Sequence, residues 1–457
     1  MNYRATGLLA LSLVIGLVAC GPTGQKNAEK IEKVRPVKTT IADVEAGIRK
    51  YIAAQTEAGD GLFHLQDDTL DLDMHLVRVH TEYLSVLSPG EFFACVDLAD
   101  STGDVYDVDF FLKGEPGNME VTQTTVHKLN GKPFYTWRQK ADKTWGQVPV
   151  KGASNDLLGV IEGEDQFTFQ YSVVLPETKE SARMWIPVPK TDRWQKVTLT
   201  HSKLTGNYME IEDQRYGNAI FYFEFGPSDS GKELRLDYDV VRREKTAYSD
   251  ASDDADNYLG SSALLPTGGR FAAIADSVLA DERGQNNLVK ARALYDYIID
   301  NMRYAKQGTY GTGDANFACD AKSGNCTEFH SLFISLARSV GIPARFAIGA
   351  AIPSDRNDGG VNGYHCWAEF YAEGKWWPVD ISEANKYTAL ATYYFGHHPA
   401  NRIEFSHGRD LVVNPAPIDG KILFLAYPIF EMEGRKQQVE TTFTFTRKRE
   451  SQTGAKQ

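Results

Sequence analysis

Cys326 stands at the predicted start of a helix, where a thiol can act as a nucleophile. Apolar residues recur after it at helical spacing until Gly341-Ile342-Pro343 ends the pattern. Asn325 is a suitable cap for this helix, and Glu328 follows it at the spacing of a capping box. In a first helical turn, the unpaired N–H groups and the helix dipole favour negative charge and so lower a thiol pKa. The pattern therefore predicts a reactive thiolate at Cys326.

A hairpin with a defined turn is predicted further along the chain. Segments 364–371 and 376–381 have the aromatic-rich composition of strands. Glu373-Gly374 lies between them and has the composition of a two-residue hairpin turn. This turn fixes the register of the hairpin, because it makes Ala372 the partner of Lys375.

The predicted register brings a histidine and an aspartate together. Asp380 faces Trp367 and lies diagonally beside His365 on the same face of the hairpin, within reach of a hydrogen bond. A register shift of one residue would move Asp380 to the opposite face, so the prediction depends on the turn. Cys326, His365 and Asp380, in this order, form the set that nucleophilic thiol catalysis requires.

These segments resemble the transglutaminase-like superfamily, and most of all its bacterial transglutaminase-domain proteins. The resemblance extends over about residues 258–415 and is carried by Gly324-Asn325-Cys326, Arg338-Ser339-Val340-Gly341-Ile342-Pro343-Ala344-Arg345, His365-Cys366-Trp367-Ala368-Glu369 and Trp377-Pro378-Val379-Asp380. It implies a papain-like α+β core with Cys326 as the nucleophile, His365 as general base and acid, and Asp380 as the carboxylate that orients the imidazole. The superfamily contains peptidases, amidases, acyl transferases and crosslinking enzymes, so the resemblance does not decide the reaction.

The predicted reaction begins when the Cys326 thiolate attacks an amide carbonyl of a peptide or protein and forms a thioester. Water would complete hydrolysis of this acyl-enzyme, whereas an amine acceptor would complete transglutaminase-type transfer. Hydrolysis is favoured, because water is abundant at an exposed surface and the sequence shows no acceptor pocket. The expected substrate is a peptide or protein of the cell envelope, and cell-wall peptide is an alternative.

Two further alternatives belong to other classes of function. In the first, the chain is a non-catalytic binding or scaffold protein with a residual papain-like core, although all three catalytic residue types are present. In the second, thiols and imidazoles near the helix start bind zinc, and the candidate ligands are Cys319, Cys326, His330, His365 and Cys366. These residues include no Cys-x-x-Cys pair, so neither a metal nor a cofactor is predicted.

The amino terminus carries the features of a lipoprotein signal peptide. Arg4 precedes an apolar stretch from Leu8 to Val18, which is too short to span a bilayer. Leu17-Val18-Ala19-Cys20 is similar to a lipobox. Residues 1–19 are therefore predicted to be removed, which leaves Cys20 lipidated as the first mature residue.

The expected location is the bacterial cell envelope, with attachment to a membrane through the lipid on Cys20. Gly21, next to the lipidated cysteine, favours the outer membrane, and residues 20–37 are polar enough to act as a tether. The net charge of −12 argues against a nucleic-acid partner and against a basic patch for anionic lipid.

The five cysteines are too few to frame the fold with disulfides. Cys319 and Cys366 both lie near the predicted nucleophile, and a disulfide between them is reasonable in an oxidising periplasm. Two free buried thiols explain the same sequence equally well, because sequence does not supply the geometry.

Three folded regions are expected after the tether, and together they predict an α+β protein. Residues 38–150 combine one amphipathic helix with alternating strands, which is typical of a small α+β domain. Residues 158–247 contain short strands separated by turns, as in a β-sandwich. Residues 258–447 form the predicted transglutaminase-like catalytic domain, whose sheet the strands of 422–445 are expected to complete. The first two regions are the expected sites for envelope protein partners.

Overall fold

The computed structural model describes most of the chain after Lys38. The described ranges are 39–66, 70–139, 145–149, 159–250, 254–306 and 310–448, and they belong to one compact unit that begins at Thr39. The predicted signal peptide, Cys20 and the tether lie outside these residues.

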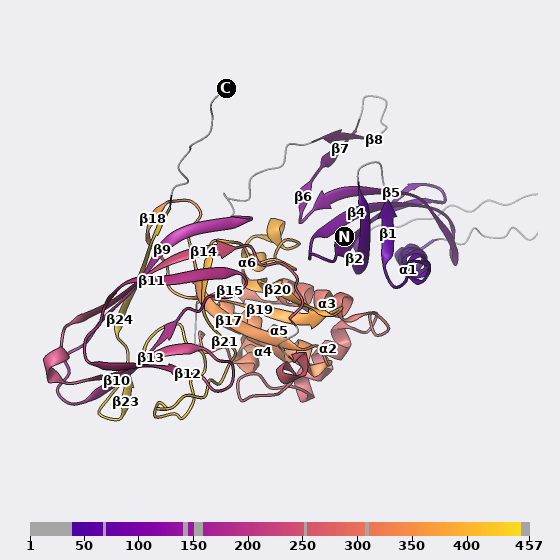
Figure 1. Cartoon of the computed structure of the whole chain (residues 1–457). Helices are drawn as coiled ribbons and strands as arrows, with labels where there is room; N and C mark the ends of the chain where they lie inside the picture. Colours follow the sequence, from indigo (N-terminus) through magenta and orange to yellow (C-terminus); the bar gives the residue numbers. More distant parts are fainter. Residues whose placement is uncertain are drawn as a thin grey trace, which may run out of the picture. The chain divides into compact units, whose positions relative to one another are not determined.

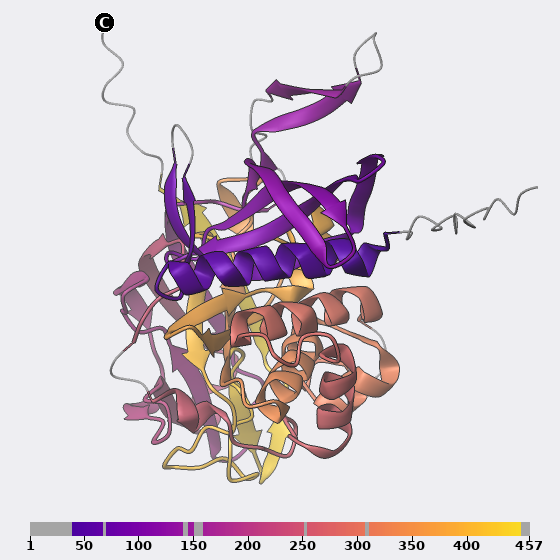
Figure 2. The same ribbon diagram turned by 90° about the vertical axis from the view of Figure 1, so that its right-hand side faces the viewer.

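The first region is a helix packed against an antiparallel sheet, as the sequence predicts. Helix α1 (Ile41–Ala58), indigo in Figure 2, lies across the sheet and buries an apolar stripe of Val44, Ile48 and Ile52. The sheet has six strands in sequence order: β1 (Phe63–Gln66), β2 (Asp71–Ser88), β3 (Glu91–Asp100), β4 (Val105–Glu115), β5 (Asn118–Leu129) and β6 (Lys132–Pro133). The hydrophobic residues between helix and sheet form a core of their own. A separate pair, β7 (Tyr135–Gln139) and β8 (Trp145–Pro149), follows the sheet.

Two five-stranded antiparallel sheets follow, and their side chains share one hydrophobic core. The first sheet contains β12 (Asn207–Glu212), β13 (Ala219–Phe225), β10 (Ala182–Val188), β22 (Ile429–Met432) and β23 (Arg435–Gln437) in that order. The second contains β11 (Gln195–Lys203), β14 (Glu233–Arg243), β9 (Glu164–Val174), β24 (Glu440–Arg447) and β18 (Asp358–Gly360).

The strands at the end of the chain correct one prediction. We expected the strands of 422–445 to complete the catalytic sheet, but β22 pairs with β10 and β24 pairs with β9. Figure 1 shows the pairing of β24 with β9 as a yellow strand beside a magenta one. The cause is packing, because Phe443 and Phe445 of β24 contribute to the core shared by these sheets.

The third region positions the predicted catalytic residues. Its sheet has the order β20 (Lys375–Val379), β19 (His365–Ala372), β17 (Ala344–Ala351) and β21 (Arg402–His407). Helix α5 (Cys326–Ser339) contacts β17 and β19. The other helices are α2 (Gly269–Val278), α3 (Asn287–Asn301), α4 (Ala315–Ala321) and α6 (Ile381–Lys386), and a short parallel pair joins β15 (Arg303–Tyr304) to β16 (Ser323–Gly324).

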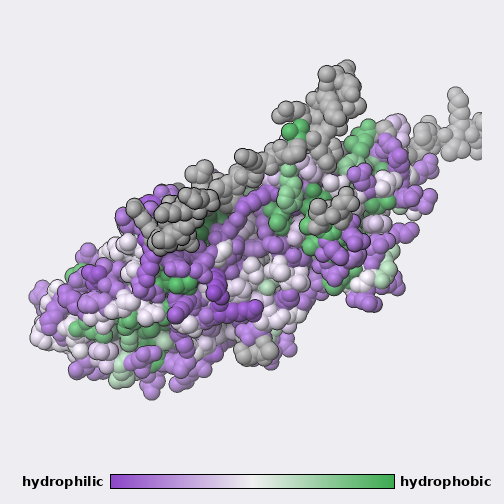
Figure 3. All heavy atoms as spheres, turned by 45° about the horizontal axis from the view of Figure 1, so that its top comes forward, coloured by the Kyte–Doolittle hydropathy of each residue, from purple (hydrophilic) through white to green (hydrophobic). Residues whose placement is uncertain are grey.

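Hydrophilic residues cover much of the face shown in Figure 3, and hydrophobic residues form scattered patches on it. None of the helices in the described part of the chain combines the length and apolar character needed to cross a membrane. The α+β fold class is confirmed at this level, with several antiparallel sheets and helices gathered around α5.

Candidate active site

Helix α5 begins at Cys326, as the sequence predicts, and its first turn is closed by a capping box. The Asn325 side chain accepts a hydrogen bond from the Thr327 N–H at 2.8 Å, and the Glu328 carboxylate accepts one from the Asn325 N–H at 3.1 Å. Cys326 is 2% exposed. The local sequence therefore fixes the thiol in the first helical turn, where the helix dipole favours a thiolate.

Glu328 has a second role that the sequence pattern did not reveal. Its other carboxylate oxygen accepts hydrogen bonds from the Gly311 N–H at 2.8 Å and the Gly313 N–H at 2.9 Å. The same loop is held by Arg409, which donates to the carbonyl oxygen of Thr312 at 3.1 Å and to Ser331 Oγ at 3.1 Å. The capping residue thus also anchors the loop that precedes the helix.

The hairpin has the predicted turn and register. Glu373 and Gly374 both have positive φ angles, of 50° and 75°, as a type I′ turn requires, and Ala372 pairs with Lys375. The ladder ends at the pair Ala368 and Val379, so the expected pairing of Asp380 with Trp367 does not form.

Asp380 instead caps helix α6, and from that position it still reaches His365. The distance between His365 Nε2 and Asp380 Oδ2 is 2.7 Å. The other carboxylate oxygen, Oδ1, accepts hydrogen bonds from Ser382 Oγ at 2.9 Å and from the Glu383 N–H at 3.1 Å. The aspartate is therefore held by the turn into α6 rather than by the strand.

Arg402 supplies a further contact of this carboxylate, and sequence reasoning did not find it. Its guanidinium donates to Asp380 Oδ2 at 2.6 Å and lies 4.9 Å from the centre of the Trp367 ring. Asp380 and Arg402 are both buried, with exposed fractions of 0% and 1%. A buried carboxylate between two cationic partners is stable only in its charged form.

The pKa values of the His365 and Asp380 side chains reflect this arrangement. Burial lowers the pKa of the His365 imidazole, but the negative charge of Asp380 and hydrogen bonds to Asp380 and Cys326 raise it to about 9. Burial raises the pKa of Asp380, but the charges of His365 and Arg402 hold it well below its usual range. The imidazole is therefore protonated and the carboxylate charged near neutral pH.

The Cys326 thiol lies beside both His365 and Cys366. Burial raises its pKa, but hydrogen bonds from the Cys366 and His365 side chains, the charge of His365 and the Cys366 N–H lower it to about 5. Because Nε2 of His365 is occupied by Asp380, the Nδ1 side of the ring is left for the thiol. The site therefore contains a thiolate and an imidazolium, the charge state of an activated thiol nucleophile.

His330 joins the two helix starts and was considered from the sequence only as a zinc ligand. Its Nδ1 lies 2.7 Å from the Cys326 carbonyl oxygen, and its Nε2 accepts the Ile381 N–H at 3.1 Å. Burial lowers the pKa of this imidazole to about 4, which keeps the ring neutral. His330 thus links the turn that carries the thiol to the start of α6, next to Asp380.

The alternative zinc set does not assemble in the described structure. Cys319 lies on α4, where Arg270 donates to its sulfur at 3.0 Å. Among the described residues, the groups of three or more candidate ligand atoms within 4.8 Å of one another all lie on the first sheet. Cys319 and Cys366 are both free thiols, so the structure does not have the disulfide between them. Cys366 is buried, as the second explanation expected, whereas Cys319 is only half-buried.

Three tyrosines lie close enough to Cys326 for a thiolate to affect their phenols. Burial raises the pKa of Tyr304, Tyr364 and Tyr427, and the negative charge of Cys326 raises it further. Tyr364 also accepts a hydrogen bond from the Asn325 side chain at 3.0 Å. These three aromatic side chains therefore lie near the thiol.

A cavity of about 560 Å³ lies elsewhere, between the two five-stranded sheets and the sheet that contains β19. Its lining includes Trp194, Tyr216, Lys245, Arg345 and Glu369. None of the three predicted catalytic side chains lines this cavity, so it is separate from the thiol.

Comparison with known proteins agrees with the resemblance seen in the sequence. Residues 273–381 match the Transglutaminase-like superfamily. The chain contains a transglutaminase-like domain. The matched segment begins within α2 and ends at the first residue of α6, so it includes Cys326, His365 and Asp380.

The similarity to other proteins extends beyond the transglutaminase-like domain of this chain. An uncharacterised protein of Haemophilus influenzae is 27% identical over an alignment of 321 residues that covers 59% of this chain and 86% of that protein. A solved structure from Cytophaga hutchinsonii, provisionally described as a cysteine protease, is 15% identical, covers 63% of this chain and 99% of its own, and has a TM-score of 0.43. Another, from Parabacteroides distasonis and provisionally described as a protease, is 13% identical, covers 74% and 68%, and has a TM-score of 0.23.

Proposed function

We propose that the chain is a cysteine enzyme that acts on amide bonds of peptides or proteins through a thioester. One observation carries the proposal: a buried thiol in a first helical turn lies beside an imidazole whose far nitrogen is 2.7 Å from a buried carboxylate. Cys326 is the proposed nucleophile, His365 the general base and acid, and Asp380 the residue that orients His365. The papain-like core expected from the resemblance supplies the same arrangement.

In the acylation step, the Cys326 sulfur attacks the carbonyl carbon, and the carbonyl oxygen takes the negative charge. The Cys326 N–H, in the first turn of α5, is a suitable donor to this oxygen because it has no acceptor within the helix. His365 then gives its proton to the leaving amine as the carbon–nitrogen bond breaks. The products are a thioester on Cys326 and a free amine.

In the deacylation step, neutral His365 removes a proton from water, which attacks the thioester carbonyl. The carbon–sulfur bond breaks, the carboxylic acid leaves, and Cys326 returns as thiolate beside protonated His365. If an amine took the place of water, the product would be a new amide. We favour hydrolysis, and the test below distinguishes the two.

The decisive experiment compares product formation by the wild type and Cys326→Ala on a peptide library, with and without a primary amine. We expect the wild type to release shorter peptides and Cys326→Ala to release none. Cys319→Ser is the matched control, because Cys319 lies on α4, where its sulfur accepts a hydrogen bond from Arg270. Equal product from the wild type and Cys326→Ala would refute the nucleophile, and amine-linked products would replace hydrolysis by transfer.

We further propose that the enzyme is anchored in the bacterial cell envelope by lipid on Cys20. The lipobox-like residues before Cys20 support this proposal. Metabolic labelling with a fatty acid should mark the wild type and not Cys20→Ala. Separation of the labelled cells into inner and outer membranes tests the proposed outer-membrane location, and the first two regions of the chain remain the proposed contacts for envelope proteins.

A further inference from the structure

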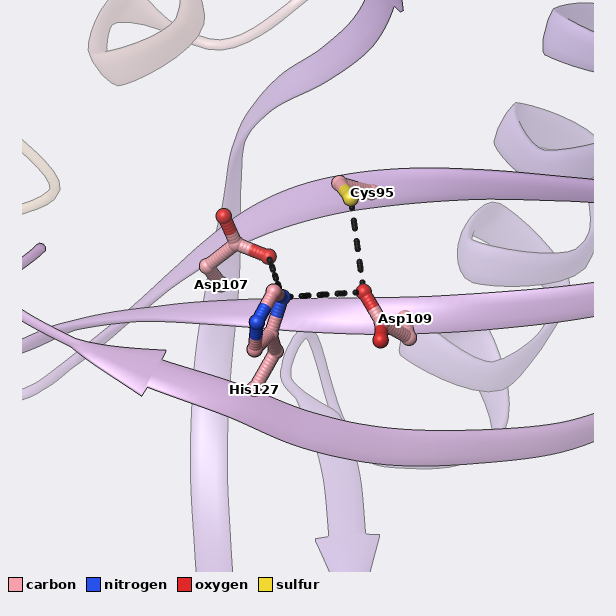
Figure 4. Close-up of side chains that lie close together, drawn as sticks. All are labelled: Cys95, Asp107, Asp109 and His127. Atoms are coloured by element: carbon pink, nitrogen blue, oxygen red, sulfur yellow. Dashed lines mark hydrogen bonds and ion pairs between the residues drawn. The ribbon is translucent and has the colours of Figure 1, made fainter. Parts of the chain in front are cut away.

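Four metal-ligating side chains point toward one another on the first sheet, far in sequence from the catalytic residues. Figure 4 shows Cys95 on β3, Asp107 and Asp109 on β4, and His127 on β5. Cys95, Asp107 and Asp109 are buried, and the His127 side chain is 14% exposed. Residues of the opposite face, such as Val108, pack in the core beneath α1. The cluster therefore lies on the face of the sheet opposite the core beneath α1.

The strand register explains why these four side chains meet. Asp107 and Asp109 are two residues apart on β4 and so share a face, and Cys95 is the direct partner of Asp109. A β-bulge brings in the fourth side chain: Asp107 pairs with Lys128 and Val108 with Val126, so His127 is the extra residue between them. Bulges redirect side chains, and they are frequent beside functional sites.

The distances within the cluster fit a tetrahedral metal ion. Asp109 Oδ1 lies 3.3 Å from Cys95 Sγ and 3.4 Å from His127 Nδ1, and Asp107 Oδ1 lies 3.8 Å from His127 Nδ1. All four ligand atoms lie within 4.8 Å of one another. With zinc bonds of about 2.0–2.3 Å, the ligands of a tetrahedral site are roughly 3.3–3.8 Å apart.

The hydrogen bonds around the cluster orient its members as ligands. His127 Nε2 lies 3.1 Å from the Tyr135 carbonyl oxygen, to which it can only donate, so a neutral His127 carries its lone pair on Nδ1, toward the two carboxylates. Within the described residues, neither His127 Nδ1 nor the buried Asp107 Oδ1 has a hydrogen-bond partner. Lone pairs that face one another in a buried space are stabilised by a cation between them.

The second oxygens of both aspartates are held from outside the cluster. Tyr135 donates its hydroxyl to Asp109 Oδ2 at 2.8 Å, and Lys128 donates to Asp107 Oδ2 at 2.7 Å. A divalent ion with one thiolate, two carboxylates and a neutral imidazole leaves one negative charge, which Lys128 balances. Such outer contacts are typical of metal sites, since they fix the direction of each ligand.

A neighbouring group, formed by His80, Asp97 and Asp107, is better explained as an ion-pair network. Asp97 lies 3.0 Å from His80 Nε2 and 3.0 Å from a guanidinium nitrogen of Arg292. Cationic side chains thus already neutralise Asp97. The group of Cys95 and His127 is distinguished by its thiol, a ligand type that the group of His80 and Asp97 does not contain.

We propose that Cys95, Asp107, Asp109 and His127 bind one zinc ion that stabilises the first sheet. The thiolate and imidazole ligands favour zinc over magnesium or calcium, which prefer oxygen ligands alone. Four protein ligands in a buried position leave no coordination site for a substrate, so the role is structural. Binding exchanges the Cys95 proton, which donates to Asp109 in the metal-free state, for a bond between sulfur and zinc.

Metal titration of the purified full chain tests this proposal. After removal of metal with a chelator, we expect one equivalent of zinc to bind and to raise the unfolding temperature. Cobalt(II), added alone as a probe, should give a thiolate-to-cobalt charge-transfer absorption in the wild type. This absorption should persist in the controls Cys319→Ser and Cys326→Ala, whose cysteines lie outside the cluster, and disappear in Cys95→Ala and in His127→Ala.

A second variant keeps the test valid if these ligand variants fail to fold. Tyr135→Phe removes only the hydroxyl that holds Asp109, so we expect it to fold and to bind zinc roughly 10–100-fold more weakly. Two results would overturn the proposal: a folded wild type that binds no zinc and gives no cobalt absorption, or an absorption that is lost in Cys326→Ala. In the first case, the pairing of His127 with Asp109 at 3.4 Å accounts for the cluster.

Discussion

His365 Nε2 lies 2.7 Å from Asp380 Oδ2, although the strand ladder of the hairpin ends at Val379, one residue before the aspartate. The carboxylate is held in place because Asp380 also caps α6 and because Arg402 donates a hydrogen bond to Asp380 Oδ2. The orientation of the proposed general base therefore depends on a strand, a helix start and an arginine from β21.

Replacement of Asp380 by asparagine should reduce both activity and stability. Without the carboxylate, His365 loses the charge that raises its pKa, and we expect kcat/KM to fall by about 10²–10⁴-fold. Arg402 would also become a buried cation without its partner, which typically costs roughly 3–5 kcal/mol of unfolding free energy. Peptide turnover and denaturant unfolding of Asp380→Asn measure the two effects.

Ser382→Ala is the matched control for this prediction. It removes one hydrogen bond to Asp380 Oδ1 and leaves the charge in place, so the expected loss of unfolding free energy is about 0.5–1.5 kcal/mol. Wild-type kcat/KM in a folded Asp380→Asn protein would contradict the proposed role of the carboxylate.

The ion pair of Cys326 and His365 predicts a defined pH window. The pKa of Cys326 is lowered from 9.0 to about 5, so its contribution to stability is lost as the pH falls through about 5. The pKa of His365 is raised from 6.5 to about 9, so its contribution is lost as the pH rises through about 9. Activity should therefore follow a bell-shaped curve between these two values.

Alkylation by iodoacetamide measures the lower limit of this window without a substrate. Peptide mapping separates the labelling of Cys326 from that of Cys319, and the Cys326 rate should rise with a midpoint near pH 5. In His365→Ala the midpoint should move upward, toward the value of an unassisted thiol. A wild-type midpoint at the ordinary thiol pKa would exclude the thiolate–imidazolium pair.

The start of α5 and the register of the hairpin could be predicted, because the residues that determine each of them lie close together in the sequence. The start of α5 follows from Asn325 and Glu328, which act within one helical turn of Cys326. The hairpin register follows from Glu373-Gly374, because a two-residue turn leaves only one pairing. Whether these residues catalyse a reaction stays a prediction until activity is measured.

Features made by distant segments were not predicted. Arg402 approaches Asp380 from another strand, and no spacing along the chain signals that contact. The final strands were recognised as strands and assigned to the wrong sheet, because alternation identifies a buried face without identifying its partner. The cluster of Cys95 and His127 was missed for the same reason, since its members come from three strands and one of them is directed by a bulge.

Cys366 should tune the thiol rather than take part in the reaction. Its side chain and N–H both donate hydrogen bonds that lower the pKa of Cys326, and its own burial raises the pKa of Cys366, which keeps it protonated. A hydrogen bond is worth about 0.5–1.5 kcal/mol, so Cys366→Ala should raise the pKa of Cys326 by up to about 1. The alkylation midpoint measures this change.

Cys366→Ser separates the effect of the hydrogen bond on the Cys326 pKa from the effect of lost packing, because a hydroxyl restores a donor at nearly the same position. We expect its alkylation midpoint to return toward that of the wild type, while Cys366→Ala remains shifted. Complete loss of Cys326 alkylation in both variants, with the fold intact, would instead indicate that Cys366 is required for the reaction itself.

His330 should make the stability of the fold depend on pH through its buried, neutral ring. Its pKa is lowered from 6.5 to about 4, so between these values the unfolded chain binds a proton that the folded chain does not. Unfolding free energy therefore falls as the pH falls from 6.5 to 4, by at most about 3 kcal/mol from this residue.

His330→Gln retains an amide that can donate to the Cys326 carbonyl oxygen and accept from the Ile381 N–H, but it does not titrate. Its stability should consequently fall less over this range than that of the wild type, as measured by denaturant unfolding at each pH. Equal pH dependence in the two proteins would show that His330 is not neutral in the fold, and the link between α5 and α6 would then have to be an ion pair with Asp380, whose Oδ1 lies 3.6 Å from His330 Nε2.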